Sequence, residues 1–340
     1  MLAIKDSYKE VDWSEIENLH LEYCIKLLKS KIKSINKTKC NRYYRKIYKV
    51  VDHVVKGNDV ISLRDIILCE PEKMIEVNNA LMNKISNLVD TDKANRTIKH
   101  IFDYKSFIEK SILLEDETEW GAYQLSRKLN VRVCPYCNRH YTNTVIDEEA
   151  TDKNYIIRPE FDHFYPRSKY PFLGLSLYNL IPSCHICNSK KSDVVFSLND
   201  YINPYISGFG DGLKFNYSFS GEHVEGEILS EERIKIDLII SGNDADKIEG
   251  NIEAFKLKEI YDQSHRDIVV ELIAKKRKHP GSYLKSVQNL FEKAKLSKEE
   301  VYRLALGNYC NEKDFGNRPL SKMTKDIALE LGLIKKDLIK

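Results

Sequence analysis

The chain has 340 residues, of which 42% are hydrophobic and 31% are charged, and its formal net charge is +3. This composition is typical of an ordinary globular protein and excludes a disordered one, because enough apolar residues are present to build a core. The small net charge does not by itself indicate a nucleic-acid partner.

The sequence also limits where the protein acts and how many lobes it has. No run of 18 or more apolar residues occurs, which argues against a membrane-spanning helix. The first residues, Met1 to Asp6, become acidic too early for a signal peptide, so we expect a cytoplasmic location. The length favours two or three lobes.

Residues 1–130 are expected to form a helical amino-terminal lobe that docks a partner or a substrate. Apolar residues recur at helical spacing from Ile16 to Ile35, and further helices are predicted over 41–56, 71–89, 97–114 and 117–129. The helix over 41–56 is rich in tyrosine and lysine. That composition is compatible with nucleic-acid contact, but ordinary amphipathic packing is the commoner reason for it.

Short strands and loops are expected in the middle of the chain, over residues 131–195. We predict a short strand over 130–134, a hairpin formed by 141–146 and 155–160, a strand over 178–181 and a helix that begins at Cys187. The local order is therefore strand, loop, strand, helix.

A mixed, largely helical lobe is expected over residues 196–340. Alternating apolar residues predict strands over 213–220 and 233–240, and helical spacing predicts helices over 244–279 with an interruption near Asn251, 282–294, 297–306 and 321–331. The predicted fold class is α+β, a mainly helical protein with a small central core.

Four of the eight cysteines form two C-x-x-C pairs, Cys134 with Cys137 and Cys184 with Cys187. Each pair can present two sulfurs to one ion, and two pairs complete the tetrahedral shell of a structural zinc ion. Four unliganded core cysteines are the alternative, and a thioredoxin-like redox motif is disfavoured because two pairs occur outside a βαβ pattern. Four sulfurs close the site, so His185 is not expected to bind the zinc. The scattered cysteines are interpreted as small buried hydrophobic residues: Cys24, Cys40, Cys69 and Cys310.

Asp162, His163 and Asn188 are the residue types that phosphodiester hydrolysis requires. A histidine can activate water, and a carboxylate with an amide oxygen can hold a hard divalent cation. Each residue alone has an ordinary explanation, since a lone histidine is usually structural and Asn188 could cap the helix that begins there.

The order of these residues resembles a known family, the HNH endonucleases, also called His-Me finger or ββα-metal nucleases. The resemblance rests on Asp162-His163, on Asn179-Leu180, and on Cys184-x-x-Cys187-Asn188 followed by Lys190 and Lys191, with Cys134-x-x-Cys137 completing the zinc site. It covers roughly residues 131–195. It implies a central ββα-metal core held together by zinc, between the lobes 1–130 and 196–340.

The resemblance implies a role for each matched residue. His163 would be the general base, Asp162 and Asn188 would bind the catalytic Mg²⁺ or Mn²⁺, and Asn179 would hold the loop that orients the histidine. Contacts to phosphate are expected from Arg167, Lys169, Lys190 and Lys191, with surface solubility as the alternative. Ten basic residues against six acids between Arg127 and Lys191 give weak support to these contacts.

A narrower resemblance rests on the run His163-x-x-Pro-x-Ser-Lys-Tyr-Pro171. This run is similar to that of HNH nucleases from bacterial anti-phage systems, including the Septu and retron-associated ones. Such nucleases often act beside an ATPase, and this chain has no P-loop, so an ATP-driven step would come from a partner protein.

The sequence therefore predicts a metal-dependent endonuclease that cleaves DNA, as the effector of a defence system. RNA as the substrate is not excluded. The alternative from another class is a catalytically inactive, zinc-stabilised nucleic-acid-binding or adaptor module.

Overall fold

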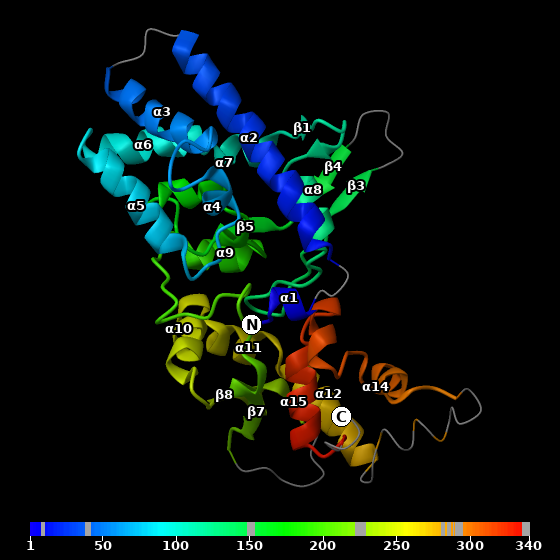
Figure 1. Ribbon diagram of the computed structural model, residues 1–340. Helices are drawn as coiled ribbons and strands as arrows, with labels where there is room; N and C mark the ends of the chain where they lie inside the picture. Colours follow the sequence, from blue (N-terminus) through cyan, green and yellow to red (C-terminus); the bar gives the residue numbers. More distant parts are fainter. Residues whose placement is uncertain are drawn as a thin grey trace. The chain divides into compact units, whose positions relative to one another are not determined.

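The computed structural model describes residues 1–7, 11–37, 42–147, 154–221, 229–279, 283, 287, 289 and 295–334. The chain forms two compact units (Figure 1). Unit 1 comprises Met1–Lys9, Arg132–Tyr141 and Asn199–Lys340, and unit 2 comprises Glu10–Val131 and Thr142–Leu198. The division into domains 1–130, 131–195 and 196–340 stays a prediction about independent folding units.

Unit 2 contains the helices of the amino-terminal half and the strands of the middle of the chain. Its helices are α2 (Trp13–Lys37), α3 (Arg42–Val55), α4 (Leu63–Ile67), α5 (Met74–Ser86), α6 (Thr91–Ile101), α7 (Tyr104–Glu109), α8 (Ala122–Leu129) and α9 (His185–Lys191). Its strands are β1 (Ile112–Leu113), β2 (Glu119–Trp120), β3 (Val145–Asp147), β4 (Asn154–Ile157), β5 (Glu160–His163) and β6 (Leu180–Ser183). They pair as three antiparallel two-stranded hairpins, β1 with β2, β3 with β4 and β5 with β6.

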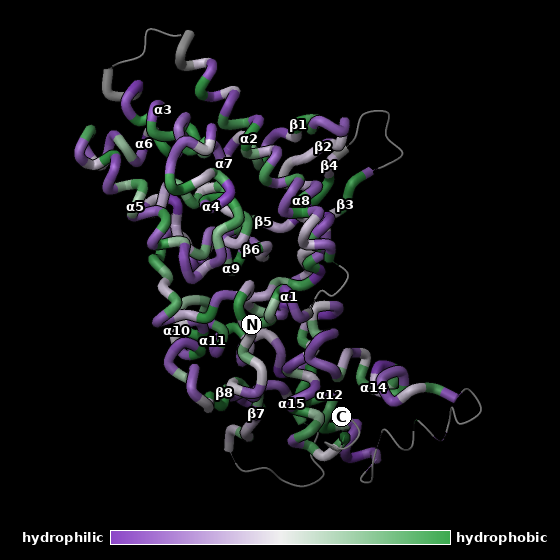
Figure 2. Tube along the Cα trace, viewed as in Figure 1, coloured by the Kyte–Doolittle hydropathy of each residue, from purple (hydrophilic) through white to green (hydrophobic). Residues whose placement is uncertain are grey.

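The long helix α2 runs along one side of unit 2. Hydrophobic and hydrophilic residues alternate along it, as Figure 2 shows, and the buried ones, among them Ile16, Tyr23 and Leu28, recur at helical spacing. This face contacts α4, α6 and α8. Burial of a continuous apolar stripe is what stabilises a helix of this length in water.

The connection between β5 and β6 passes through the core of unit 2. Its 3₁₀ turn η1 (Pro171–Leu175) is buried at every residue and is contacted by α4, α5 and α6. Phe172 packs edge-on against Phe102, with ring centroids 5.4 Å apart. The helices therefore fix the loop that follows His163.

The helix predicted over 97–114 is wrong in its extent, because the structure has two separate helices there, α6 and α7. Phe102 ends α6, and Asp103 caps α7 by accepting a hydrogen bond from the Ser106 amide at 3.1 Å. An aspartate that satisfies the first amides of a new helix competes with continuation of the old one. The 130–134 strand is also reduced, to a single bridge between Val133 and Tyr141.

Unit 1 is built on one β-hairpin covered by helices. Strand β7 (Leu213–Phe219) pairs antiparallel with β8 (Ile234–Ile240), which confirms the two strands predicted there. Its helices are α1 (Ile4–Ser7), α10 (Ala245–Phe255), α11 (Leu257–Ser264), α12 (Arg266–Lys278), α14 (Lys298–Leu306) and α15 (Ser321–Glu330). Helix α15 contacts β7, while α11 and α12 contact β8.

The predicted helix over 244–279 is three helices, and its break is not at Asn251. The breaks fall at Lys256, whose φ is 51°, and at His265. Asn251 lies inside α10, where its buried Oδ1 accepts the Ile202 amide at 2.7 Å. The helix predicted over 282–294 lies almost entirely outside the described residues, as does Cys40.

These elements confirm the α+β class, with helices predominating and small antiparallel hairpins between them. In the part of the chain that the structure describes, no helix is both long and apolar enough to cross a bilayer.

His20 makes unit 2 sensitive to acid. Its ring is fully buried, with Nε2 2.8 Å from the Leu175 carbonyl oxygen and Nδ1 accepting from the Trp120 indole at 3.4 Å, and burial lowers its pKa to about 4. The unfolded chain, with an ordinary histidine pKa near 6.5, binds this proton more readily. The stability that comes from keeping His20 neutral is therefore fully present above about pH 6.5, and it is lost as the pH falls towards 4.

We expect urea unfolding of the wild type to lose about 2 kcal/mol more between pH 7 and pH 4.5 than unfolding of His20→Gln does. Equal losses in the two proteins would show that His20 does not carry this pH dependence. His100→Gln, at an exposed position of α6, should behave as the wild type does.

Candidate active site

A strand–strand–helix unit carries the candidate residues. Strand β5 pairs antiparallel with β6, so that Asp162 faces Ile181 and His163 faces Leu180, and α9 follows directly and contacts β5. The predicted order of strand, loop, strand and helix is thus observed. Helix α9 begins at His185 instead of Cys187, so Asn188 lies within the helix and does not cap it.

An open pocket of about 380 Å³ lies over this unit, within unit 2. Asp162, His163, Arg167 and Asn188 all line it. The other lining residues come from α7, from the strand region and from the segment after α9: Tyr104, Ile108, Arg158, Glu160, Phe161, Pro166, Ser192 and Asp193. Three of the predicted catalytic residues therefore share one concave surface, which the sequence spacing alone did not require.

His163 is half-buried, and its hydrogen bond defines its tautomer. Nε2 lies 3.0 Å from the Gly174 carbonyl oxygen, which can only accept, so Nε2 carries the proton and Nδ1 carries the lone pair. Burial lowers the pKa of His163 to about 3, with the positive charges of Arg167 and Lys191 acting in the same direction. The ring is therefore neutral at pH 7, which is the form that can accept a proton.

Tyr104 of α7 fixes the imidazole from the side. The two rings meet edge to face with centroids 4.5 Å apart, and the Tyr104 hydroxyl donates to the Phe161 carbonyl oxygen at 3.0 Å. Sequence reasoning missed Tyr104, because it is 59 positions before the histidine and no local motif marks it.

Asn179 is fully buried and braces the chain after His163. Its Oδ1 accepts from the Tyr165 amide at 2.8 Å, and its Nδ2 donates to the carbonyl oxygens of Tyr165 and Leu173 at 3.0 and 3.1 Å. All three hydrogen-bonding groups of the amide are used on one loop. A role in holding that loop stays a proposal, with this geometry in its support.

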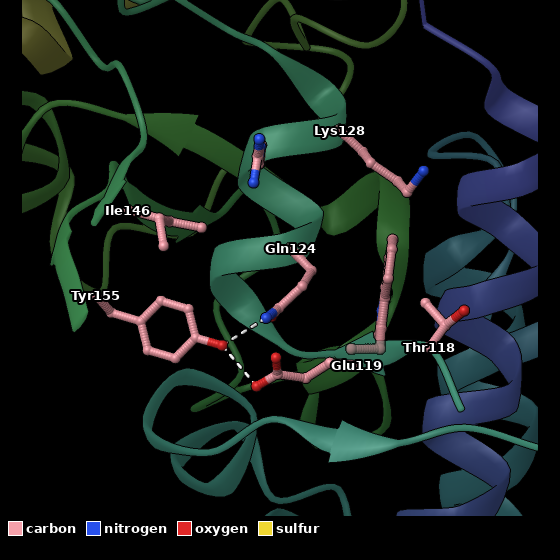
Figure 3. Close-up of a pocket in the computed structure, with 8 residues that line it drawn as sticks. Thr118, Glu119, Gln124, Lys128, Ile146 and Tyr155 are labelled. Atoms are coloured by element: carbon pink, nitrogen blue, oxygen red, sulfur yellow. Dashed lines mark hydrogen bonds between the residues drawn. The ribbon is translucent and has the colours of Figure 1, made fainter. Parts of the chain in front are cut away.

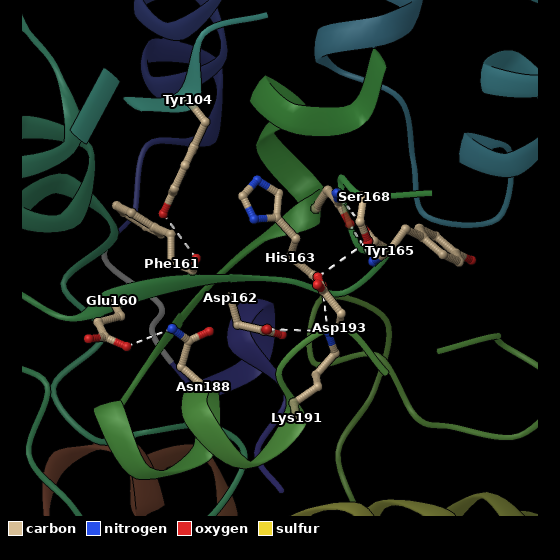
Figure 4. Close-up of polar contacts among 11 residues, drawn as sticks. Tyr104, Glu160, Phe161, Asp162, His163, Tyr165, Ser168, Asn188, Lys191 and Asp193 are labelled. Carbon is tan, nitrogen blue, oxygen red and sulfur yellow. Dashed lines mark hydrogen bonds and ion pairs between the residues drawn. The ribbon is translucent and has the colours of Figure 1, made fainter. Parts of the chain in front are cut away.

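Asn188 is oriented by Glu160, a second residue that the sequence did not single out. Its Nδ2 donates to Glu160 Oε2 at 2.6 Å (Figure 4). Glu160 Oε1 lies 2.8 Å from His185 Nδ1. A carboxylate only accepts hydrogen bonds, so the atom of Asn188 that faces Glu160 is Nδ2. The amide oxygen Oδ1 is then the atom that can bind a cation. A sequence signal for Glu160 exists, since residues two apart on a strand share a face and Glu160 precedes Asp162 by two.

Asp162 is buried at 2% exposure and forms an ion pair with Lys191, whose Nζ lies 3.2 Å from Oδ1. A carboxylate and an amide oxygen lining one pocket fit a hard divalent ion such as Mg²⁺ or Mn²⁺. Asp162 and Asn188 are the residues that would hold it.

The basic residues expected to contact phosphate are placed differently from one another. Arg167 is exposed, lines the pocket and lies over the Tyr104 ring at 5.0 Å. Lys169 and Lys190 are exposed outside the pocket lining. Lys191 is fully buried, which differs from the expectation that it meets phosphate. Arg158 lines the pocket and was not anticipated.

The four cysteines of the two C-x-x-C pairs form a buried cluster. Their sulfurs all lie within 4.8 Å of one another. Tetrahedral zinc, with bonds of about 2.3 Å, sets its sulfur ligands about 3.8 Å apart. Cys134, Cys137, Cys184 and Cys187 therefore fit a structural zinc ion. The other described cysteines, Cys24, Cys69 and Cys310, are buried outside this cluster.

A larger pocket of about 730 Å³ lies elsewhere in unit 2, beside α8 (Figure 3). There the Tyr155 hydroxyl donates to Glu119 at 2.6 Å and accepts from Gln124 at 2.7 Å. Its lining includes no histidine or asparagine to complement the single carboxylate. The smaller pocket is the better candidate because a histidine, an aspartate and an asparagine line it together.

Comparison with known proteins gives one partial likeness. No family model matches the chain, and no solved structure matches it. A stretch of 95 residues is 34% identical to the Septu protein PtuB of Bacillus thuringiensis. The match covers 28% of this chain and 33% of that protein, so the likeness concerns only a third of the relative's length.

Proposed function

We propose that this chain is a metal-dependent endonuclease of the HNH type that hydrolyses DNA phosphodiester bonds. The observation that carries the proposal is the shared pocket, which brings together the neutral imidazole of His163, the carboxylate of Asp162 and the amide of Asn188. A module that only binds nucleic acid has no use for a base beside two cation ligands.

In the proposed reaction an activated water hydrolyses the phosphodiester. A water in the pocket gives a proton to Nδ1 of His163 as its oxygen bonds to phosphorus; the bond to the 3′-oxygen breaks, and that oxygen takes a proton from solvent. The products carry 5′-phosphate and 3′-hydroxyl ends. Asp162 and Asn188 would hold a divalent cation, which would neutralise the charge that develops on the phosphate and the leaving oxygen.

Arg167 would contact the substrate phosphate. It is exposed, lines the pocket and contributes to the low pKa of His163. A phosphate dianion or diester beside Arg167 offsets its positive charge, which raises the basicity of His163 when substrate is present. Arg167 thereby links substrate binding to the strength of the base.

We further propose that the chain acts in anti-phage defence. The support is the partial likeness to the Septu protein PtuB, together with the run from His163 to Pro171. Because the chain has no P-loop, an ATPase partner would be a separate protein.

The test is incubation of the purified protein with supercoiled, linear and single-stranded DNA and with RNA, in Mg²⁺, Mn²⁺ or EDTA, alone and with the products of neighbouring genes. We expect cleavage of DNA that requires the divalent cation and leaves 5′-phosphate ends, detected by ligation without prior phosphorylation. Binding that is independent of divalent cations, with no cleavage under any condition, would favour the adaptor alternative. Cleavage of RNA alone would show that the substrate is RNA and not DNA, and the proposed hydrolysis of a phosphodiester would still hold.

A further inference from the structure

Lys191, the last residue of α9, is fully buried beneath the candidate site. Its ammonium lies 3.2 Å from Asp162 Oδ1 and 2.5 Å from the His163 carbonyl oxygen (Figure 4). It also lies over the Phe196 ring, 4.8 Å from the ring centroid. Lysine is almost never fully buried unless its charge is paired. These partners account for the burial.

The neighbouring lysine shows that the burial is specific. Lys190 is exposed, and successive residues on a helix point about 100° apart, so only one of the two can face β5. The sequence, which offers two consecutive lysines, does not distinguish them. The packing of α9 on β5 assigns the inner position to Lys191.

The two oxygens that Lys191 contacts belong to consecutive residues with different tasks. One is the side chain of Asp162, and the other is the main chain of His163. A single ammonium thus holds both the carboxylate and the peptide that carries the imidazole. Groups held in this way keep their geometry before substrate arrives.

We infer that Lys191 is a positioning residue of the site, which holds Asp162 and the His163 backbone in place and makes no contact with phosphate. The inference rests on the proposed nuclease function. It assigns the two lysines different tasks, with Lys190 left as the one that can meet the DNA backbone.

The salt dependence of DNA binding separates these tasks. In buffer without Mg²⁺ or Mn²⁺, so that no cleavage occurs, we expect Lys190→Gln to reduce the slope of log affinity against log salt by about 0.9, as loss of one phosphate contact does. Lys191→Met should leave that slope unchanged and lower cleavage in Mg²⁺ by about 10- to 100-fold. A slope that falls equally in both variants, or wild-type cleavage by Lys191→Met, would overturn the inference.

Thermal unfolding gives a readout that does not depend on cleavage. Lys191→Met leaves the buried Asp162 carboxylate without its ammonium, so we expect its melting temperature to fall by about 5 °C or more. Adding Asp162→Asn should restore part of the loss, and this double variant keeps the test usable if the single variant does not fold. If the effects of Lys191→Met and Asp162→Asn on the melting temperature are additive, the inference alone is overturned. A wild type that cleaves no nucleic acid would overturn the proposed function and the inference with it.

Discussion

Replacing His163 with alanine is expected to lower the rate of Mg²⁺-dependent DNA cleavage by about 10² to 10⁴-fold. The reason is that the His163 ring lines the pocket and that Nε2 donates to the Gly174 carbonyl oxygen, which leaves Nδ1 with the lone pair that can accept a proton. The measurement is conversion of supercoiled plasmid to nicked and linear forms under single-turnover conditions, with zinc content and circular dichroism recorded in parallel.

The matched control is His100→Ala, which removes an exposed histidine of the same unit outside the pocket lining. It should cleave at the wild-type rate. His163→Asn is a useful second variant, because it keeps a polar side chain of smaller size in the half-buried site. Cleavage at the wild-type rate by folded His163→Ala would show that another group activates the water.

Replacing Cys184 with serine is expected to release the zinc and to unfold the region around it. Apparent binding free energies of structural zinc sites are about 10 to 16 kcal/mol, as large as the whole stability of a typical domain of about 5 to 15 kcal/mol. The measurements are zinc stoichiometry by mass spectrometry of the metal and thermal unfolding with and without chelator.

Cys24→Ala is the control for this experiment, because Cys24 is a buried cysteine outside the cluster. It should retain one zinc per chain, and its free energy of unfolding should fall by only about 1 kcal/mol, as for small core truncations. A wild type that contains no zinc, together with normal unfolding of Cys184→Ser, would favour the alternative in which the four cysteines are ordinary core residues.

Local sequence signals predicted much of the fold. The apolar spacing of α2 and the alternation in β7 and β8 predict those elements within a few residues, because one face of each is buried and the other is solvated. Two of the misses are helices that end earlier than apolar spacing predicts. After Phe102, Asp103 caps a new helix, and at Lys256 the backbone adopts the left-handed conformation.

The candidate site could be predicted as residue types and not as an arrangement. Asp162, His163, Asn179 and Asn188 were predicted, and the structure places three of them in one pocket with Asn179 behind the loop. Tyr104 could not be predicted, since nothing near it in the chain marks it as a neighbour of His163. Glu160 could have been found from its two-residue spacing to Asp162.

By itself the sequence determined which atoms are available: four thiols in two C-x-x-C pairs, a base, and two oxygen donors. Those requirements follow from ligand chemistry, which depends on residue type and short spacing. Only the tertiary structure decided where each side chain lies. The packing of α9 on β5 buries Lys191 and exposes Lys190, because a helix can turn only one of two consecutive residues inward.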